Sequence, residues 1–168
     1  WGEAHDLLVE ALLESPRDTD LLYEQSTIAE KLGNLVEMEA LLRQVMAIQP
    51  EHHNAYNALG YSLADRNQRL PEARELIAKA LQLAPGEPFI TDSMGWVEYR
   101  LGHTDEALRL LGTAYRARPD TEIGAHFGEV LWVSGRRNEA LGVFRAARER
   151  DAANEVLQET LARLKVGL

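Results

Sequence analysis

The chain has 168 residues, a formal net charge of −9 at pH 7 and no cysteine. This acidity argues against binding to nucleic-acid phosphates, and the lack of cysteine excludes disulfides, thiolate metal sites and cysteine nucleophiles. Charged residues make up 27% and hydrophobic residues 45%, a folded-domain composition. No apolar run approaches the roughly 18 residues of a membrane span, so we expect no direct membrane insertion of these residues.

The chain repeats itself with a period close to 34 residues. Prolines recur at Pro16, Pro50, Pro85 and Pro119, with intervals of 34, 35 and 34 residues. A small residue follows each of these prolines, at Ser26, Gly60, Gly95 and Gly128. A second series then places small, large and small residues four and three positions apart, as in Ala73, Ile77 and Ala80. This spacing is one face of a helix, so each period is predicted to hold two helices.

In chain order, we expect part of a unit at 1–18 containing only a second helix, and then four complete helix pairs. The pairs are predicted at 19–52, 53–87, 88–120 and 121–154, with a last helix at 155–166. The third unit carries one extra residue in the turn around 66–70. Since the chain begins inside a helix, it is expected to belong to a longer protein. The last helix is expected to cover the open end of the array, with docking of a partner as the alternative.

These residues resemble the tetratricopeptide repeat, whose period is 34 residues. The resemblance covers nearly the whole chain and implies an all-α, right-handed superhelical solenoid of antiparallel helix hairpins, with about ten helices. It also implies that the first helix of each unit lines a concave face that binds proteins or peptides. On that face we place the candidate site: Asn54, Asn57, Tyr61, Asp65, Phe89, Asp92, Trp96, Tyr99, Arg100, His126, Glu129 and Trp132.

Four of these residues, Tyr61, Trp96, Tyr99 and Trp132, are expected to form an aromatic track for an extended peptide. The alternative is that some of the rings pack between neighbouring units. Acidic residues outnumber basic ones on the predicted concave face. A clamp for a partner's C-terminal carboxylate is therefore disfavoured, and a neutral or basic ligand is favoured.

The sequence contains no phosphate-binding loop, no His-Glu-x-x-His and no Gly-x-Ser-x-Gly motif. The adjacent His52 and His53 do not predict a metal site, because further converging ligands are lacking. We therefore expect neither catalysis nor a cofactor. The competing interpretation is an enzyme whose site converges around Asp92, His126 and Glu129.

A narrower resemblance rests on three stretches, 57–65, 92–100 and 128–132. They are similar to the C-terminal repeats of proteobacterial outer-membrane tetratricopeptide lipoproteins that act as adaptors for a periplasmic C-terminal-processing protease. This resemblance implies a periplasmic protein tethered to the outer membrane, whose partners are that protease and its substrates. A generic assembly scaffold, in the envelope or the cytoplasm, is the alternative.

Overall fold

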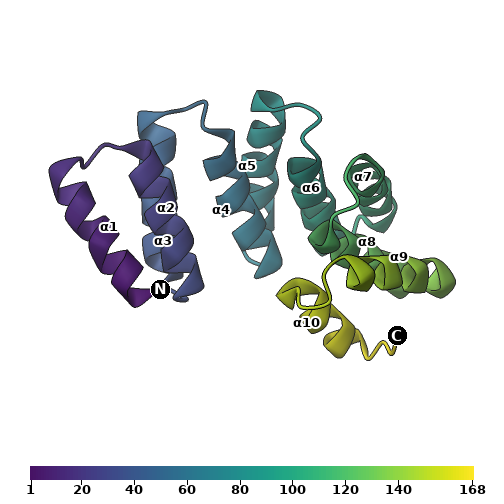
Figure 1. Cartoon of the computed structure of the whole chain (residues 1–168). Coiled ribbons are helices and arrows are strands. Elements are labelled where there is room, and N and C mark those ends of the chain that lie inside the picture. The colour runs from purple at the N-terminus through teal and green to yellow at the C-terminus, as the bar shows by residue number, and fades with distance from the viewer.

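The computed structural model describes residues 1–168 as ten α-helices joined by short turns, which confirms the expected all-α superhelical array (Figure 1). The helices are α1 (Gly2–Glu14), α2 (Thr19–Lys31), α3 (Leu35–Ile48), α4 (His53–Asp65), α5 (Leu70–Leu83), α6 (Pro88–Arg100), α7 (Thr104–Ala117), α8 (Thr121–Val133), α9 (Arg137–Arg150) and α10 (Glu155–Leu164). Each expected complete unit contains one helix pair, from α2 with α3 to α8 with α9.

Local sequence signals explain where the helices begin. The side chain of Asp18 accepts hydrogen bonds from the amides of Asp20 and Leu21 at the start of α2, and Asn154 caps α10 through the amide of Leu157. Proline occupies the first turn of α5 and of α6, where its missing N–H costs no helical hydrogen bond. The longer turn before α5 accommodates its extra residue with left-handed backbone at 67 and 69.

Close contact between the two helices of a pair depends on the recurring small residues. A Cβ atom added to Gly60 would lie 2.6 Å from Cγ1 of Ile77, and one added to Gly95 would lie 2.7 Å from Cγ of Leu111. The small–large–small faces of the second helices are buried at these contacts. The repeat pattern in the sequence is therefore a packing pattern.

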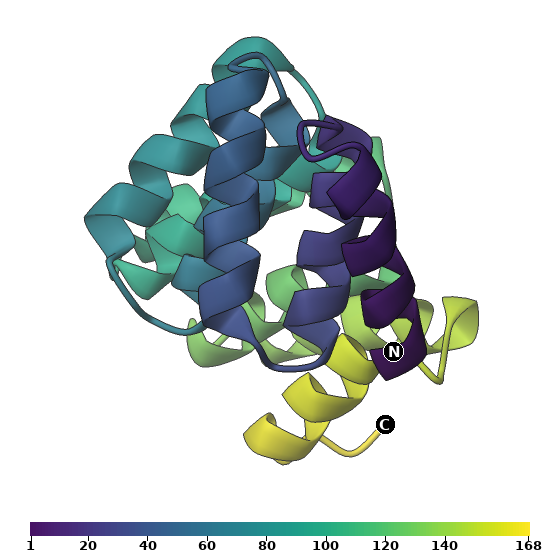
Figure 2. The ribbon, with the colours of Figure 1, turned by 90° about the vertical axis from the view of Figure 1, so that its left-hand side faces the viewer.

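The array curves, and the even-numbered helices line its inner side. Besides pairing with its partner, α4 packs on α6, α6 on α8 and α8 on α10. Contacts of this kind are expected on the inner side of a curve, where successive units come closest. Figure 2 shows the array turned by 90°, with the hairpins coiling around a common axis and α10 crossing one end. The face formed by α2, α4, α6, α8 and α10 is called the concave face below.

The apolar core has two parts. The larger runs from α2 to α8 and includes Leu22, Leu59 and Trp96, whereas the smaller joins α8, α9 and α10 around Phe144 and Leu157. The last helix is thus attached to the array by its own apolar contacts. At the other end α1 contains no fully buried residue: Leu7, Val9 and Leu13 are exposed, whereas Leu8 and Leu12 are half-buried.

Candidate functional site

All of the predicted site residues lie on α4, α6 and α8, but they differ in exposure. Asn54 and Asp65 are exposed, and the half-buried ones are Asn57, Tyr61, Phe89, Tyr99, Arg100 and Trp132. The buried ones, with no more than 5% of each residue exposed, are Asp92, Trp96, His126 and Glu129. These four residues therefore shape the concave face from beneath instead of presenting their side chains to a partner.

Asp92, His126 and Tyr61 form a hydrogen-bonded chain across three helices. Nδ1 of His126 lies 2.9 Å and 3.0 Å from the two carboxylate oxygens of Asp92, and Nε2 lies 3.0 Å from the hydroxyl of Tyr61. Because a carboxylate only accepts hydrogen bonds, Nδ1 of His126 is the donor to Asp92. The indole of Trp96 stacks on the imidazole at a centroid distance of 4.3 Å. These contacts hold α4, α6 and α8 together.

Electrostatics determine the chemistry of this chain of residues. Burial disfavours the charged imidazole of His126, but the Asp92 carboxylate outweighs burial and raises the histidine pKa. Burial, reinforced by Asp65, Asp92 and other carboxylates, raises the pKa of the Tyr61 hydroxyl. Phenolate formation is therefore suppressed. The arrangement resembles an acid–base relay but lacks an activated nucleophile.

The enzyme interpretation required Asp92, His126 and Glu129 to converge, and only the first two do. Both oxygens of Glu129 instead accept hydrogen bonds from the guanidinium of Arg163 on α10, at 2.8 Å and 2.6 Å. The hydroxyl of Tyr99 also donates to Glu129, at 3.4 Å. A buried carboxylate paired in this way is a structural anchor for α10. No group of three or more His, Asp or Glu side chains is placed to hold a metal ion.

Arg163 was not expected to contribute, because the sequence pattern places it off the apolar face of the last helix. Its side chain is 53% exposed, yet its guanidinium reaches a carboxylate 34 residues earlier in the chain. A basic residue in the last turn of a helix is common, and nothing in the sequence connects it with Glu129.

The continuous exposed aromatic track that we expected is not present. Trp96 is 2% exposed and belongs to the apolar core. The alternative interpretation, in which a ring packs between neighbouring units, is therefore correct for this residue. The reason is that α6 lies between α4 and α8: Nε1 of Trp96 donates to Oδ1 of Asp65 at 3.2 Å, and His126 stacks on the ring. Trp132 is half-buried, with Arg137 over its ring.

Three hollows follow one another along the concave face. The first, of about 420 Å³, lies on α2 beside Trp1 and includes Tyr23 and Glu24. The second, of about 130 Å³, lies between α4, α6 and α8, and the third, of about 210 Å³, lies between these helices and α10. Tyr61 and His126 line both the second and the third hollow. Their hydrogen bond therefore forms the wall between the two.

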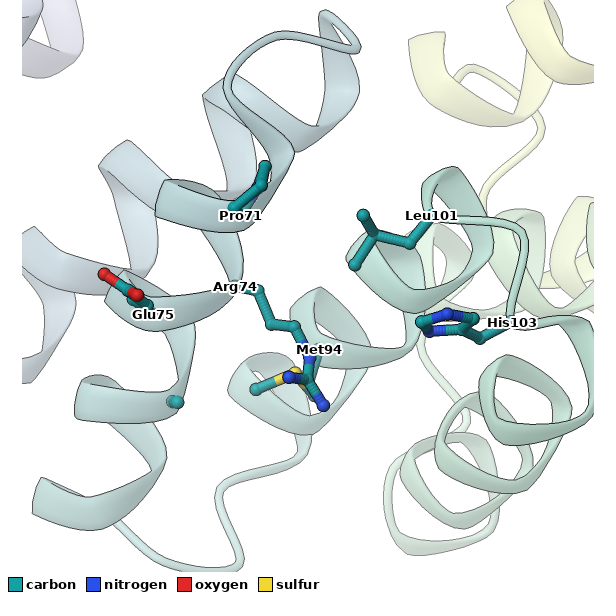
Figure 3. A pocket seen from close by; sticks show the side chains of 7 residues that line it. Pro71, Arg74, Glu75, Met94, Leu101 and His103 are labelled. Carbon is teal, nitrogen blue, oxygen red and sulfur yellow. The ribbon is translucent and has the colours of Figure 1, made fainter.

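A separate pocket of about 440 Å³ lies between α5 and α6 and was not expected from the sequence. Figure 3 shows Pro71 and Arg74 of α5 across from Met94 and His103. The buried carboxylate of Glu98 accepts a hydrogen bond from Nε of Arg74, at 2.5 Å, and lies 2.5 Å from Nδ1 of His103. Although burial acts against it, these two partners lower the pKa of Glu98. The basic residues at this pocket are thus already paired.

A family model described as "Tetratricopeptide repeat" matches residues 37–88 and 93–155, more than half of the chain. The chain therefore belongs to the tetratricopeptide repeat family. It is 49% identical over 127 residues to the TPR repeat-containing protein PA4667 of Pseudomonas aeruginosa, an alignment covering 76% of this chain and 22% of that protein. The curated relatives that it matches are much longer, since the alignments span between 10% and 22% of their length.

Solved structures show the same fold. TTC0263, a TPR protein of Thermus thermophilus, has a TM-score of 0.82 and 24% sequence identity, over 96% of this chain and 88% of that chain. YrrB, described as "a TPR protein with an unusual peptide-binding site", has a TM-score of 0.65 and 22% identity, over 94% of this chain and 84% of that chain. No helix of the present chain is both long enough and apolar enough to cross a membrane.

Proposed function

We propose that this repeat array is a non-catalytic scaffold that holds an extended segment of a partner protein along its concave face. The observation that carries the proposal is the succession of three hollows on the inner helices. The buried hydrogen bonds among Asp92, His126 and Tyr61 fix the walls of two of them before a partner arrives. A preformed groove lowers the ordering cost of binding. The description of YrrB, which shares the fold, as a protein with a peptide-binding site agrees with peptide binding by this array.

The finer proposal is that of an adaptor that presents substrates to a periplasmic C-terminal-processing protease, with the full-length protein tethered to the outer membrane. Its support is the resemblance of stretches 57–65, 92–100 and 128–132 to such adaptors. The identity of 49% to a Pseudomonas protein agrees with a proteobacterial source. The second candidate is a general assembly scaffold, because hollows along a concave face serve either role.

The concave face is tested by capture of partners from a cell-envelope extract. The test variant, Asn54→Ala with Phe89→Ala, removes two side chains that make no side-chain hydrogen bond. The matched control, Arg145→Ala with Glu149→Ala, changes two exposed residues of the outer helix α9. We expect the control to retain the partners and the concave variant to lose most of them, while both melt close to the parent. Equal capture by both variants would place binding elsewhere.

The two candidate roles are separated by proteolysis. A purified C-terminal-processing protease is given a captured protein, with and without the repeat protein. An adaptor accelerates cleavage, and the Asn54→Ala/Phe89→Ala variant accelerates it less. If the partners bind but cleavage is unchanged, the assembly scaffold is supported and the adaptor role is rejected.

A further inference from the structure

We propose that the second hollow, between α4, α6 and α8, is a subsite for one cationic side chain, lysine or arginine, of the bound segment. This inference rests on the proposed function, because it names the kind of segment that the concave face selects. The second hollow has a volume of about 130 Å³, which admits the end of a side chain and excludes a helix or strand. The residues that line this hollow include Asn57, Ala58, Phe89, Asp92 and Glu122.

The wall of the hollow suits a long basic side chain. Phe89 and Ala58 supply apolar surface against which its methylene groups can pack. The ring of Phe89 already attracts a cation, since the guanidinium carbon of Arg118 lies 4.7 Å from its centroid. A ring used in this way offers its negative face to positive charge.

Charge in the hollow also favours a cation. Glu122 lies in the first turn of α8, is exposed and forms no ion pair, so its carboxylate is free to pair with a ligand. Asp92 lies deeper and is paired with His126. Burial is the largest cause of the raised pKa of Tyr61, whose hydroxyl lies in the wall that the two hollows share. The charges of nearby acidic residues, Asp92 and Glu122 among them, raise this pKa further. The carboxylates beside the hollow therefore favour a cation, and no lysine or arginine is among the residues that line it, although the guanidinium of Arg118 lies over the ring of Phe89.

A residue that lines the hollow, Asn57, carries an acceptor without a donor. Oδ1 of Asn57 is buried and has no hydrogen-bond partner. Such an atom loses its hydration without compensation unless a ligand supplies an N–H group. An ammonium or guanidinium group carries only donors, so it would pair with the carboxylate of Glu122 and, once the Asn57 amide turns toward the hollow, with that oxygen as well. Shape, charge and the unpaired acceptor therefore indicate the same ligand chemistry.

The test uses a small probe, so that it does not depend on knowing the partner. The ¹⁵N-labelled chain is titrated with Nα-acetyl-lysine methylamide and, in parallel, with its Nε-acetylated analogue, which has the same stem and no charge. We expect the charged probe to shift the amide signals of Asn57, Phe89 and Ser93, including the side-chain NH₂ of Asn57. The neutral analogue should shift them at least about threefold less, the scale of one solvent-facing ion pair.

Two charge-matched variants make the test specific to the hollow. Glu122→Gln is expected to weaken binding of the charged probe about threefold. Glu24→Gln removes the same charge from α2, outside this hollow, and should leave probe binding unchanged. Equal effects of the two variants would mean that only the net charge matters, and the subsite would be rejected.

The remaining outcomes are also decisive. If the two probes produce equal shifts, or the charged probe produces none at millimolar concentrations, the hollow does not take a cation. A negative result here combined with loss of partner capture in Asn54→Ala/Phe89→Ala would reject the subsite and leave the proposed function standing. If the probe binds but capture of partners does not depend on the concave face, the subsite would stand and the proposed function would be rejected.

Discussion

Among single residues, Gly128 has the least space for a side chain. An added Cβ atom would lie closer to the ring of Phe144 than non-bonded carbon atoms approach one another. We expect Gly128→Ala to destabilise the fold by about 1–3 kcal/mol, because α8 must move away from α9 to make room. Urea unfolding followed by circular dichroism measures this free energy.

Gly142 provides the matched control for that substitution. It lies within α9, and an added Cβ atom would meet nothing within 4 Å. Gly142→Ala should therefore stabilise the protein by up to about 1 kcal/mol, through helix propensity alone. If Gly128→Ala were as well tolerated as Gly142→Ala, close packing would not explain the recurring small residues.

The pairing of His126 with Asp92 makes stability depend on pH. The histidine pKa is raised in the folded state, where Asp92 outweighs burial and where Asp65 and Glu122 also act. The stabilisation is therefore fully present below the ordinary pKa of about 6.5 and is lost as pH rises through the raised value. We expect the stability difference between the parent and His126→Gln, measured by urea unfolding, to be larger at about pH 5.5 than at about pH 9. A difference independent of pH would contradict the pairing.

Among the helices, α10 depends on its apolar face and on one ion pair whose carboxylate is buried. The side chain of Glu129 is 2% exposed and accepts both of its strongest hydrogen bonds from Arg163. Arg163→Ala leaves this buried carboxylate without its guanidinium partner, which we expect to cost about 1–3 kcal/mol. Hydrogen exchange should show α10 opening more readily, while α4 and α6 stay protected.

Two further variants check that interpretation. Arg150→Ala removes an exposed arginine at the end of α9 and should leave exchange in α10 unchanged. Adding Glu129→Gln to Arg163→Ala removes the unpaired charge and should restore part of the lost stability. If the double variant were no more stable than Arg163→Ala, the buried charge would not be the cause.

For the molecule as a whole, stability is expected to vary along the array, because most contacts in a repeat array join a unit to its neighbours. The helix α1 has no buried residue, whereas α4, α6 and α8 share both the core and the hydrogen bonds of Tyr61, Asp92 and His126. We expect amide exchange to be fastest in α1 and slowest in α4 and α6. Mass-spectrometric hydrogen exchange measures this order, and uniform protection along the chain would contradict it.

The repeat, the helix pairs and the all-α array could be predicted from the sequence, because the period, the helix caps and the small–large–small faces are local signals that recur in each unit. The same signals placed the candidate residues on the inner helices. Their exposure could not be predicted, since Trp96 is covered by residues of α4 and α8. The pairing of Glu129 with Arg163 and of Asp92 with His126 joins residues 34 positions apart. Contacts of this kind depend on how successive units stack in three dimensions, which no single stretch of sequence specifies.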